Sequence, residues 1–345
     1  MPDAVNIQRL RKLKNMSSHR KLSYSLAINE ALHQAMAVDK RVMLIGQGVK
    51  SPWYVGNTAQ GLLDRFGSMR VIDTPVSENG ITGVAVGAAL GGMKPVVVHP
   101  RVDFMMYAFD PIMNQAANWF YMNGGQLSVP VVFWGIINRG GEQAAQHSQA
   151  LHAMFAHMPG LKVVMPANPY DAKGLMVAAI RDRNPVVFMD DRWLYGTVAE
   201  VPSQIYSVPI GKANILTCGK DVTIAACSYL VPEAVKAAET LKEKRISAEI
   251  IDLRTIKPLD IATVVRSVSK TRRLLVADVG WLTGGVSAEL AASVGSKVFR
   301  RLKAPIARLS LPDCPAPASR FMEASYYPRA KDIEALAKKL VARRG

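Results

Sequence analysis

The chain has 345 residues, of which 49% are hydrophobic and 20% are charged. These values describe a soluble globular protein long enough for two domains, and they exclude small disulfide scaffolds, collagen-like repeats and intrinsically disordered chains. The three cysteines form no Cys-x-x-Cys pair, which argues against a structural zinc site or a disulfide framework and predicts a reducing, cytoplasmic setting. No apolar run approaches the roughly 18 residues of a membrane-spanning helix, and the amino terminus lacks a signal-peptide core. We therefore expect no membrane partner.

Basic residues are in excess, because 43 Lys and Arg stand against 27 Asp and Glu and give a net charge of +16. Such an excess points to nucleic acid, an anionic ligand or an acidic partner subunit. The basic residues gather in an amino-terminal extension (residues 1–21), between residues 254 and 303, and at the carboxyl end. Aromatic residues make up only 7% and do not alternate with basic ones as a base-stacking surface requires. We therefore predict no nucleic-acid partner and expect the charge to serve mainly contacts with a more acidic subunit.

Residues 25–38 carry apolar side chains at helical spacing, which predicts an amphipathic helix. Short β-branched runs then alternate with helical patterns. The predicted strands are 42–45, 96–98, 129–134, 163–165 and 186–189, and the predicted helices among them are 81–90, 107–122 and 171–183. Apolar strands that alternate with helices indicate a parallel sheet covered on both faces, so we expect an α/β domain over residues 22–190.

The periodic pattern is lost over residues 191–212, which predicts an inter-domain linker. A second alternating unit follows. Its predicted strands are 222–226, 246–253, 273–277 and 306–309, and its predicted helices are 232–241 and 286–294. We therefore expect a second, smaller α/β domain over residues 213–345.

Common nucleotide and acyl-transfer motifs are absent from the sequence. It has no Gly-x-Gly-x-x-Gly that opens a helix after a strand, no phosphate loop and no Gly-x-Ser-x-Gly. A different segment stands out, DTPVSENG at residues 73–80, where a strand ends and a helix rich in small residues begins. Because ligands of open α/β sheets bind where strands end, Glu78 is a candidate site residue. An equal alternative is that Glu78 only stabilises the start of the helix.

A second candidate is His147, in a loop that begins with Asn-Arg-Gly-Gly at residues 138–141. Histidine in a loop after a strand suits proton transfer or anion binding near neutral pH. A surface histidine bonded to the following helix is slightly more common for such a pattern. Phe104 is either a site residue or part of the core, where most lone phenylalanines lie.

Several segments resemble the beta subunit of the thiamine-diphosphate-dependent first component of 2-oxoacid dehydrogenase complexes, a family that includes the pyruvate, branched-chain and acetoin enzymes. They include DTPVSENGITGVAVGAAL, YMNGGQLSVP, AQHSQALHAMFAHMPGLKVVMPANPYDAKGL, AIRDRNPVVF, IDLRTIKPLD and GGVSAELAA. The resemblance extends in order from residue 22 to residue 327. It implies a transketolase-like fold, with a pyrimidine-binding domain, a smaller carboxy-terminal domain, and thiamine diphosphate held between subunits.

The resemblance also implies roles for single residues. Glu78 matches the glutamate that bonds the aminopyrimidine ring of the cofactor and promotes its activation. Phe104 matches the aromatic residue that stacks on this ring, and Val76 matches an apolar residue that supports the bent cofactor. His147 matches the histidine that contacts the substrate carboxylate or assists acyl transfer.

Two further residues, Asp182 and Asn184, match a stretch that helps to build a structural potassium site in some members. For an acid and an amide in a turn, simple capping is an equal alternative.

A separate alpha subunit holds Mg²⁺ and the diphosphate in this family, through a Gly-Asp-Gly segment that this sequence lacks. The resemblance therefore implies an alpha partner in a tetramer of two alpha and two beta chains. The expected reaction is decarboxylation of a 2-oxo acid and transfer of the acyl group to a lipoyl acyltransferase. The alternatives are a split transketolase-like enzyme that passes the unit to an aldehyde or sugar, and a catalytically silent structural subunit.

Four positions depart from the family pattern. Residues 99–101 (His-Pro-Arg) replace a segment that usually contains glutamate, and Trp134 replaces a frequent arginine. The loop at 138–142 is unusual, and Asp278 stands where histidine or glutamate is frequent. These departures concern the substrate and the acceptor, whereas the residues matched to cofactor activation are present.

Overall fold

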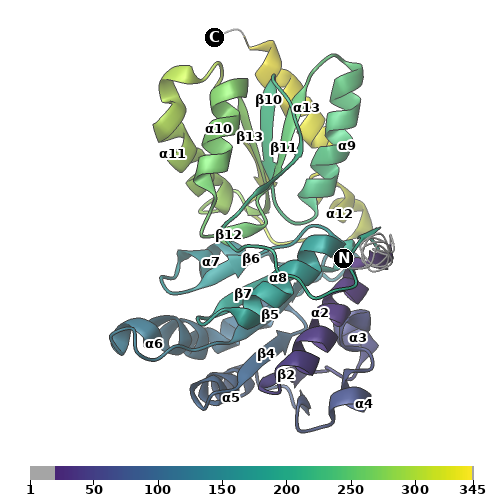
Figure 1. Cartoon of the computed structure of the whole chain (residues 1–345). Coiled ribbons are helices and arrows are strands. Elements are labelled where there is room, and N and C mark those ends of the chain that lie inside the picture. Colours follow the sequence, from purple (N-terminus) through teal and green to yellow (C-terminus); the bar gives the residue numbers. More distant parts are fainter. Residues whose placement is uncertain (1–19, 344–345) are drawn as a thin grey trace, which may run out of the picture.

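The computed structural model describes residues 20–343, which contain two large β-sheets with helices on their faces and a small two-stranded sheet (Figure 1). The larger sheet has seven strands and contains most of the strands before residue 192. In spatial order they are β12 (Thr255–Lys257), β6 (Lys162–Val164), β7 (Val186–Asp191), β5 (Val132–Ile137), β4 (Lys94–His99), β2 (Val42–Gln47) and β3 (Val71–Thr74). All neighbouring pairs are parallel except β12 with β6. The predicted parallel sheet is therefore confirmed.

Helices cover both faces of this sheet. On one face α2 (Tyr24–Val38) packs along α8 (Pro169–Arg181), and on the other lie α5 (Glu78–Leu90), η2 (Val102–Ala108), η3 (Asp110–Ala116) and α6 (Ala117–Met122). Side chains set the starts of the two packed helices, because the Ser23 hydroxyl accepts from the N–H of Leu26 and the Asn168 amide oxygen accepts from that of Asp171. Shorter helices are α3 (Pro52–Val55), η1 (Gly56–Ala59), α4 (Leu62–Phe66) and α7 (His152–His157).

The second sheet has five strands. In spatial order they are β14 (Ala307–Leu311), β13 (Leu274–Trp281), β10 (Val222–Ala226), β11 (Ala248–Asp252) and β9 (Asn214–Thr217), the last antiparallel. Helices α10 (Ile261–Thr271) and α11 (Val286–Val298) lie on one face, and α9 (Leu230–Glu243) and α13 (Ala330–Ala342) on the other (Figure 1). Two short helices are η5 (Phe299–Arg301) and α12 (Arg320–Tyr326). The smaller α/β unit is thus present.

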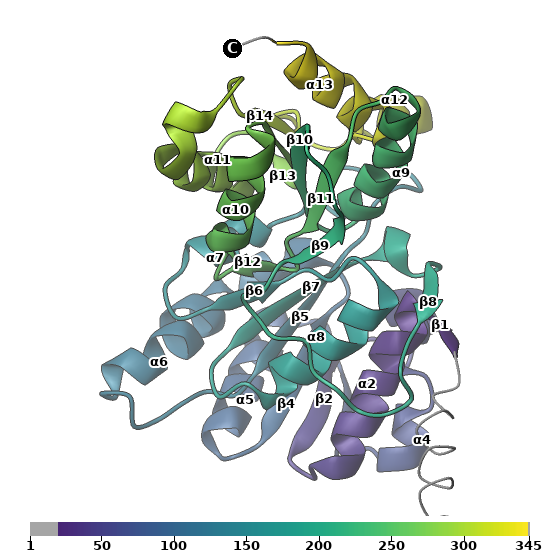
Figure 2. The ribbon, with the colours of Figure 1, turned by 45° about the horizontal axis from the view of Figure 1, so that its top comes forward.

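The second half of the chain contributes one strand to the sheet of the first half. Although β12 follows the first strands of the second half in the chain, it pairs with β6 at the edge of the first sheet (Figure 2). The ammonium group of Lys257 fixes this strand by donating to the carbonyl oxygens of Ala156 and Met158. The segment expected to be a linker also contains ordered elements, η4 (Arg192–Leu194) and β8 (Val198–Glu200), and β8 pairs with β1 (Lys21–Ser23). Most of the expected amino-terminal extension lies outside the described residues.

Two predicted elements differ from the structure. The strand predicted at 129–134 begins only at Val132, because Pro130 has no N–H to donate and the N–H of Val131 turns back to the carbonyl of Val129. The helix predicted at 107–122 begins earlier, at Val102, and passes through 3₁₀ and π turns before it becomes α-helical at Ala117. Within residues 20–343 no helix combines the length and apolarity that crossing a membrane requires.

Candidate functional site

The candidate residues lie where the parallel strands of the first sheet end. Strands β3, β4, β5 and β7 run in the same direction, so the segments that follow them emerge at one edge of the sheet. These segments contain Val76 and Glu78 after β3, Phe104 after β4, and His147 after β5. Open α/β sheets bind ligands at this edge. The fold therefore brings the four residues singled out in the sequence to one side of the molecule.

Glu78 is the first residue of α5, directly after Ser77, and its side chain is half-buried. A carboxylate in the first turn interacts favourably with the helix dipole, which agrees with the alternative that Glu78 only stabilises the start of the helix. Val76, however, exposes 68% of its surface. An apolar side chain exposed beside the helix start forms part of an open surface rather than of the core, so the segment has room for a ligand or a second chain.

A histidine buried under the site anchors this helix. The Nε2 atom of His99, at the end of β4, lies 3.2 Å from the Thr82 hydroxyl one turn inside α5. Burial lowers the pKa of His99 to about 4, so the ring is neutral at neutral pH. His99 belongs to the departing segment 99–101, and its contact connects β4 to the helix that begins with Glu78. The sequence showed an unusual residue here but gave no sign of this role.

Phe104 and His147 are in contact. Their rings meet edge to face, with centroids 5.4 Å apart at 89°. Phe104 is only half-buried, so it is not a core residue and one of its surfaces remains accessible. His147 is also half-buried and lies in a loop rather than in a helix. Phe104 thus offers an aromatic surface on which a flat ligand ring can stack, and His147 beside it can donate or accept a proton.

A buried carboxyl group supports this pair. Asp103 precedes Phe104, and its Oδ1 atom accepts the N–H of Gln149, two residues after His147. Its Oδ2 atom is buried without a hydrogen-bond partner among the described residues. Burial raises the pKa of Asp103, while the bond from Gln149 and the proximity of His147 act in the opposite direction. Asp103 therefore connects the segment after β4 to the histidine loop.

The loop before His147 is held by a buried arginine. The Arg139 Nε atom donates to Asp191 Oδ2 at 2.8 Å, and both side chains are fully buried. The guanidinium also lies over the rings of Tyr229 and Tyr327, at 5.2 and 5.6 Å from their centroids. Glu142 and Ala144 have positive φ, which is strained for residues other than glycine. The unusual loop is thus fixed between the two halves of the chain.

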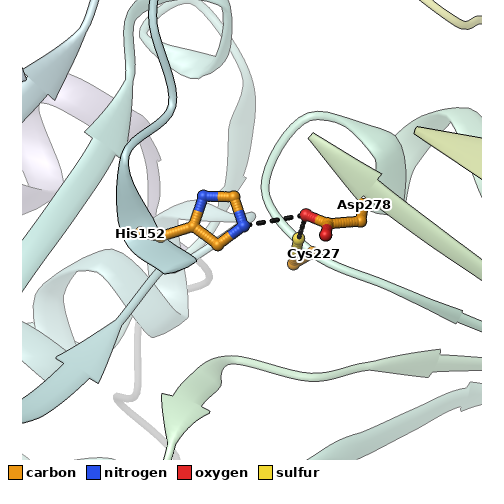
Figure 3. Close-up of side chains that lie close together, drawn as sticks. All are labelled: His152, Cys227 and Asp278. Carbon is orange, nitrogen blue, oxygen red and sulfur yellow. Dashed lines mark hydrogen bonds and ion pairs between the residues drawn. The ribbon is translucent and has the colours of Figure 1, made fainter. Parts of the chain in front are cut away.

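A second buried contact joins the halves at the start of α7 (Figure 3). The Nε2 atom of His152 lies 2.8 Å from Asp278 Oδ1, and the Cys227 thiol lies 3.8 Å from the same oxygen. The backbone N–H groups of Gly280 and Ser287 also donate to this carboxylate. Burial acts to raise the pKa of Asp278, but His152 and the two N–H groups outweigh it, so the pKa is below its ordinary value.

The sequence singled out Asp278 only as a departure from the family pattern, directly after the predicted strand 273–277. The structure places it inside β13, which continues to Trp281. Nothing in the sequence indicated that His152 is its partner, because 126 residues separate them.

The residues proposed for potassium lie elsewhere. Asp182 and Asn184 come between α8 and the start of β7, at the opposite edge of the sheet. Asp182 Oδ2 pairs with the ammonium group of Lys162 at 2.5 Å, and Oδ1 accepts the N–H of Asn184. The ion pair with Lys162 agrees with the capping alternative, but the buried Asn184 Oδ1 atom has no partner among the described residues, so the potassium site stays a prediction.

Trp134 is also separate from the site. It is fully buried in β5 and donates from Nε1 to Asp190 Oδ1 at 2.9 Å. Burial raises the pKa of Asp190 to about 6. Trp134, although it departs from the family pattern, is therefore part of the buried core around the sheet.

Comparisons with known proteins agree with the geometry. The chain matches the family model of the transketolase pyrimidine-binding domain over residues 20–197 and that of the transketolase C-terminal domain over residues 211–333. It is 44% identical to the beta subunit of acetoin:2,6-dichlorophenolindophenol oxidoreductase from Cupriavidus necator, covering 93% of this chain and 97% of that protein. It is also 44% identical to the pyruvate dehydrogenase E1 component subunit beta of Rickettsia conorii, covering 91% and 96%.

Solved structures show the same fold. A split-gene transketolase, described as an inactive beta4 tetramer, superposes with a TM-score of 0.73 at 21% identity and covers 94% of this chain and 99% of that one. A transketolase from Pichia stipitis gives a TM-score of 0.68 at 14% identity and covers 94% of this chain and 47% of its own. The chain therefore belongs to the transketolase-like thiamine-diphosphate family and, within it, to the beta subunits of 2-oxoacid dehydrogenases.

Proposed function

We propose that this chain is the beta subunit of a thiamine-diphosphate-dependent 2-oxoacid dehydrogenase that decarboxylates a 2-oxo acid and passes the acyl group to a lipoyl acceptor. The observation that carries the proposal is the gathering of Val76, Glu78, Phe104 and His147 on one sheet edge. Relatives 44% identical over nearly the whole chain, named as pyruvate and acetoin enzyme subunits, support the reaction class.

The residues present fit the pyrimidine half of the cofactor. Phe104 offers a partly accessible ring, and Val76 offers an exposed apolar surface beside Glu78. The Thr74 hydroxyl, at the end of β3, is buried without a partner among the described residues and is available to a ligand. A flat heteroaromatic ring with hydrogen-bonding nitrogens matches this combination of an aromatic surface, a carboxyl group and a hydroxyl.

Bound thiamine diphosphate supplies a nucleophilic carbon that makes decarboxylation of 2-oxo acids possible. Glu78 would then hold or release a proton at a ring nitrogen of the pyrimidine. Its place at the start of α5 fixes the backbone of Glu78, because His99 and Thr82 anchor that helix to β4. The fold thus holds the residue that would transfer this proton at the carboxyl end of the strands.

The other two residues would bind and orient. Phe104 would support the ring from one side, and its edge-to-face contact with His147 would hold the imidazole above the reacting end of the substrate. Asp103, bonded to the backbone of Gln149, would keep the histidine loop close to Phe104. His147 is then able to bind a carboxylate or to transfer a proton in the acyl step.

We further propose that activity needs an alpha subunit, in a tetramer of two alpha and two beta chains. Val76 and Glu78 lie on an incompletely covered surface, and a second chain there would exclude water from the site. The Mg²⁺ ion would be held mainly by that partner, since the sequence has no Gly-Asp-Gly segment. A potassium ion at Asp182 and Asn184 stays part of the proposal, because the buried Asn184 Oδ1 atom has no partner among the described residues.

The proposal is tested by purifying the chain alone and together with its alpha partner. We expect 2-oxo acid-dependent reduction of an artificial electron acceptor with the pair only. Transfer to a lipoyl domain would support the dehydrogenase reaction, whereas transfer only to an aldehyde or sugar would favour the split transketolase-like alternative. Absence of both decarboxylation and ketol transfer with every substrate would contradict an enzymatic role for the pair.

A further inference from the structure

Two arginines lie at the site edge and form no ion pair with a carboxylate among the described residues. Arg101 follows β4 by two residues, and Arg192 follows β7 directly. Only β5 separates these strands, which places them about 10 Å apart, within reach of two arginine side chains. Arg101 is also one turn from Phe104, because its carbonyl accepts the N–H of Phe104 at 3.2 Å. Both guanidinium groups therefore belong to the edge that carries the proposed cofactor-binding residues.

Arg192 is held rigidly. Its Nη1 and Nη2 atoms donate to the carbonyl oxygens of Trp53 and Tyr54, in the segment after β2, and it lies over the ring of Tyr195 at 5.6 Å. The side chain therefore crosses the sheet edge from β7 towards β2, over the strand that carries Arg101. The carbonyls accept from Nη1 and Nη2, whereas the buried Nε atom has no partner among the described residues. The charge of Arg192 interacts with Asp190 electrostatically but forms no ion pair with it.

Arg101 has donors that no described residue occupies. Among the described residues it makes one hydrogen bond, from Nη1 to the carbonyl of Pro100, and its buried Nε atom has no partner. Within residues 20–343 no carboxylate forms an ion pair with Arg101 or with Arg192. Burial lowers the pKa of Arg101, and the neighbouring Arg192 lowers it further. Two half-buried like charges without a counter-ion cost free energy unless an anion completes the arrangement.

The nearby carboxyl groups of Asp103 and Asp190 each accept a side-chain or backbone N–H and interact with the arginines only electrostatically, without forming an ion pair. Asp103 accepts from Gln149, and Asp190 accepts from Trp134. Asp103 interacts electrostatically with Arg101 and with His147. Its carboxyl group therefore couples the charge of the arginine to that of the histidine. The two ends of the site thus differ. His147, which can transfer a proton, lies at one end, and the guanidinium group of Arg101 lies at the other.

We propose that Arg101, backed by Arg192, binds a second anionic group on the substrate, a carboxylate or phosphate remote from the reacting carbonyl carbon. The inference rests on the proposed function, since it names the substrate class of the same site. The Nε and Nη2 atoms of one guanidinium match two oxygens of such a group. A 2-oxo acid with an uncharged side chain would leave both positive charges unpaired.

The test uses the assembled alpha–beta enzyme with a dye as electron acceptor. Two substrate pairs are matched in carbon skeleton: 2-oxoglutarate against 2-oxopentanoate, and 3-phosphohydroxypyruvate against hydroxypyruvate. We expect kcat/KM to favour one charged member by roughly 10- to 100-fold, as charge-assisted hydrogen bonds commonly do. The pair that shows the preference tells whether the group is a carboxylate or a phosphate.

Variants of Arg101 test whether this residue causes the preference for the charged substrate. Arg101→Gln should remove the preference mainly through KM, Arg101→Lys should keep part of it, and the exposed Arg300→Gln serves as the matched control. Preference for neither charged substrate, or an unchanged preference in Arg101→Gln, would overturn the inference. Loss of tetramer assembly in Arg101→Gln would also overturn it, because Arg101 would then serve the subunit interface. Absence of turnover with all four substrates would instead count against the proposed function.

Discussion

The contact between His152 and Asp278 holds the two halves of the chain together and fixes the start of α7, five residues after His147. Asp278→Ala would leave four buried donors without an acceptor, namely His152 Nε2, the Cys227 thiol and the N–H groups of Gly280 and Ser287. Each orphaned donor costs about 1–3 kcal/mol, and breaking a buried pair commonly costs about 3–5 kcal/mol. We therefore expect the free energy of unfolding to fall by about 3–5 kcal/mol.

The assay is urea unfolding of the wild type, of Asp278→Ala, of His152→Ala and of the double variant. We expect a coupling free energy between the two sites above about 1.5 kcal/mol, because contacting residues in a buried network are not independent. Lys236→Ala, which removes an exposed partner of Glu233, should change stability by less than about 0.5 kcal/mol and serves as the control.

Acid provides a second check of the same contact. The folded pKa of Asp278 lies below its unfolded value, so the stabilising contribution is complete above about pH 4 and is lost as the pH falls through the folded pKa. The difference between wild type and Asp278→Ala should therefore shrink at low pH. A coupling below about 0.5 kcal/mol at neutral pH would refute the reasoning.

Two further predictions concern buried charges. Arg139→Gln should destabilise the chain by about 3–5 kcal/mol and open residues 138–147 to proteolysis, since Asp191 would remain buried and unpaired; an uncut loop would contradict this. Burial raises the pKa of Asp252 to about 7, so its contribution to the free energy of unfolding is full below about pH 4 and is lost as the pH rises to about 7. Asp252→Asn should flatten this decline, as measured by urea unfolding at pH 5 and pH 8, and an unchanged slope would count against it.

Much of the fold could be predicted from local pattern. The β-branched runs predict most of strands β2 and β7, the centre of β4, all of β10 and the first half of β13, because buried parallel strands are continuous apolar segments. Other elements depend on distant contacts. Strand β12 has only three residues and is defined by pairing with β6, some 90 residues earlier. Helix α13 was missed although Ile333, Ala337 and Leu340 recur at helical spacing, because its many lysines were interpreted only as charge.

The residues of the candidate site could be predicted from the sequence, but the residues that anchor them could not. Glu78, Phe104 and His147 were indicated by the resemblance, and the fold brings them to one edge. Their anchors come from elsewhere in the chain, as His99 shows by bonding Thr82 and Arg139 by pairing with Asp191. Spacing alone cannot reveal such partners, because their proximity depends on the order of strands in the sheet.

The central claim is that Glu78 activates a cofactor bound between this chain and an alpha partner. Glu78→Gln keeps the size and much of the hydrogen bonding of the side chain but cannot exchange the proton. With the alpha partner present, we predict that this variant binds thiamine diphosphate nearly as well as the wild type and loses roughly 100-fold or more of its decarboxylation rate. Decarboxylation at the wild-type rate in a variant that binds the cofactor would contradict the account.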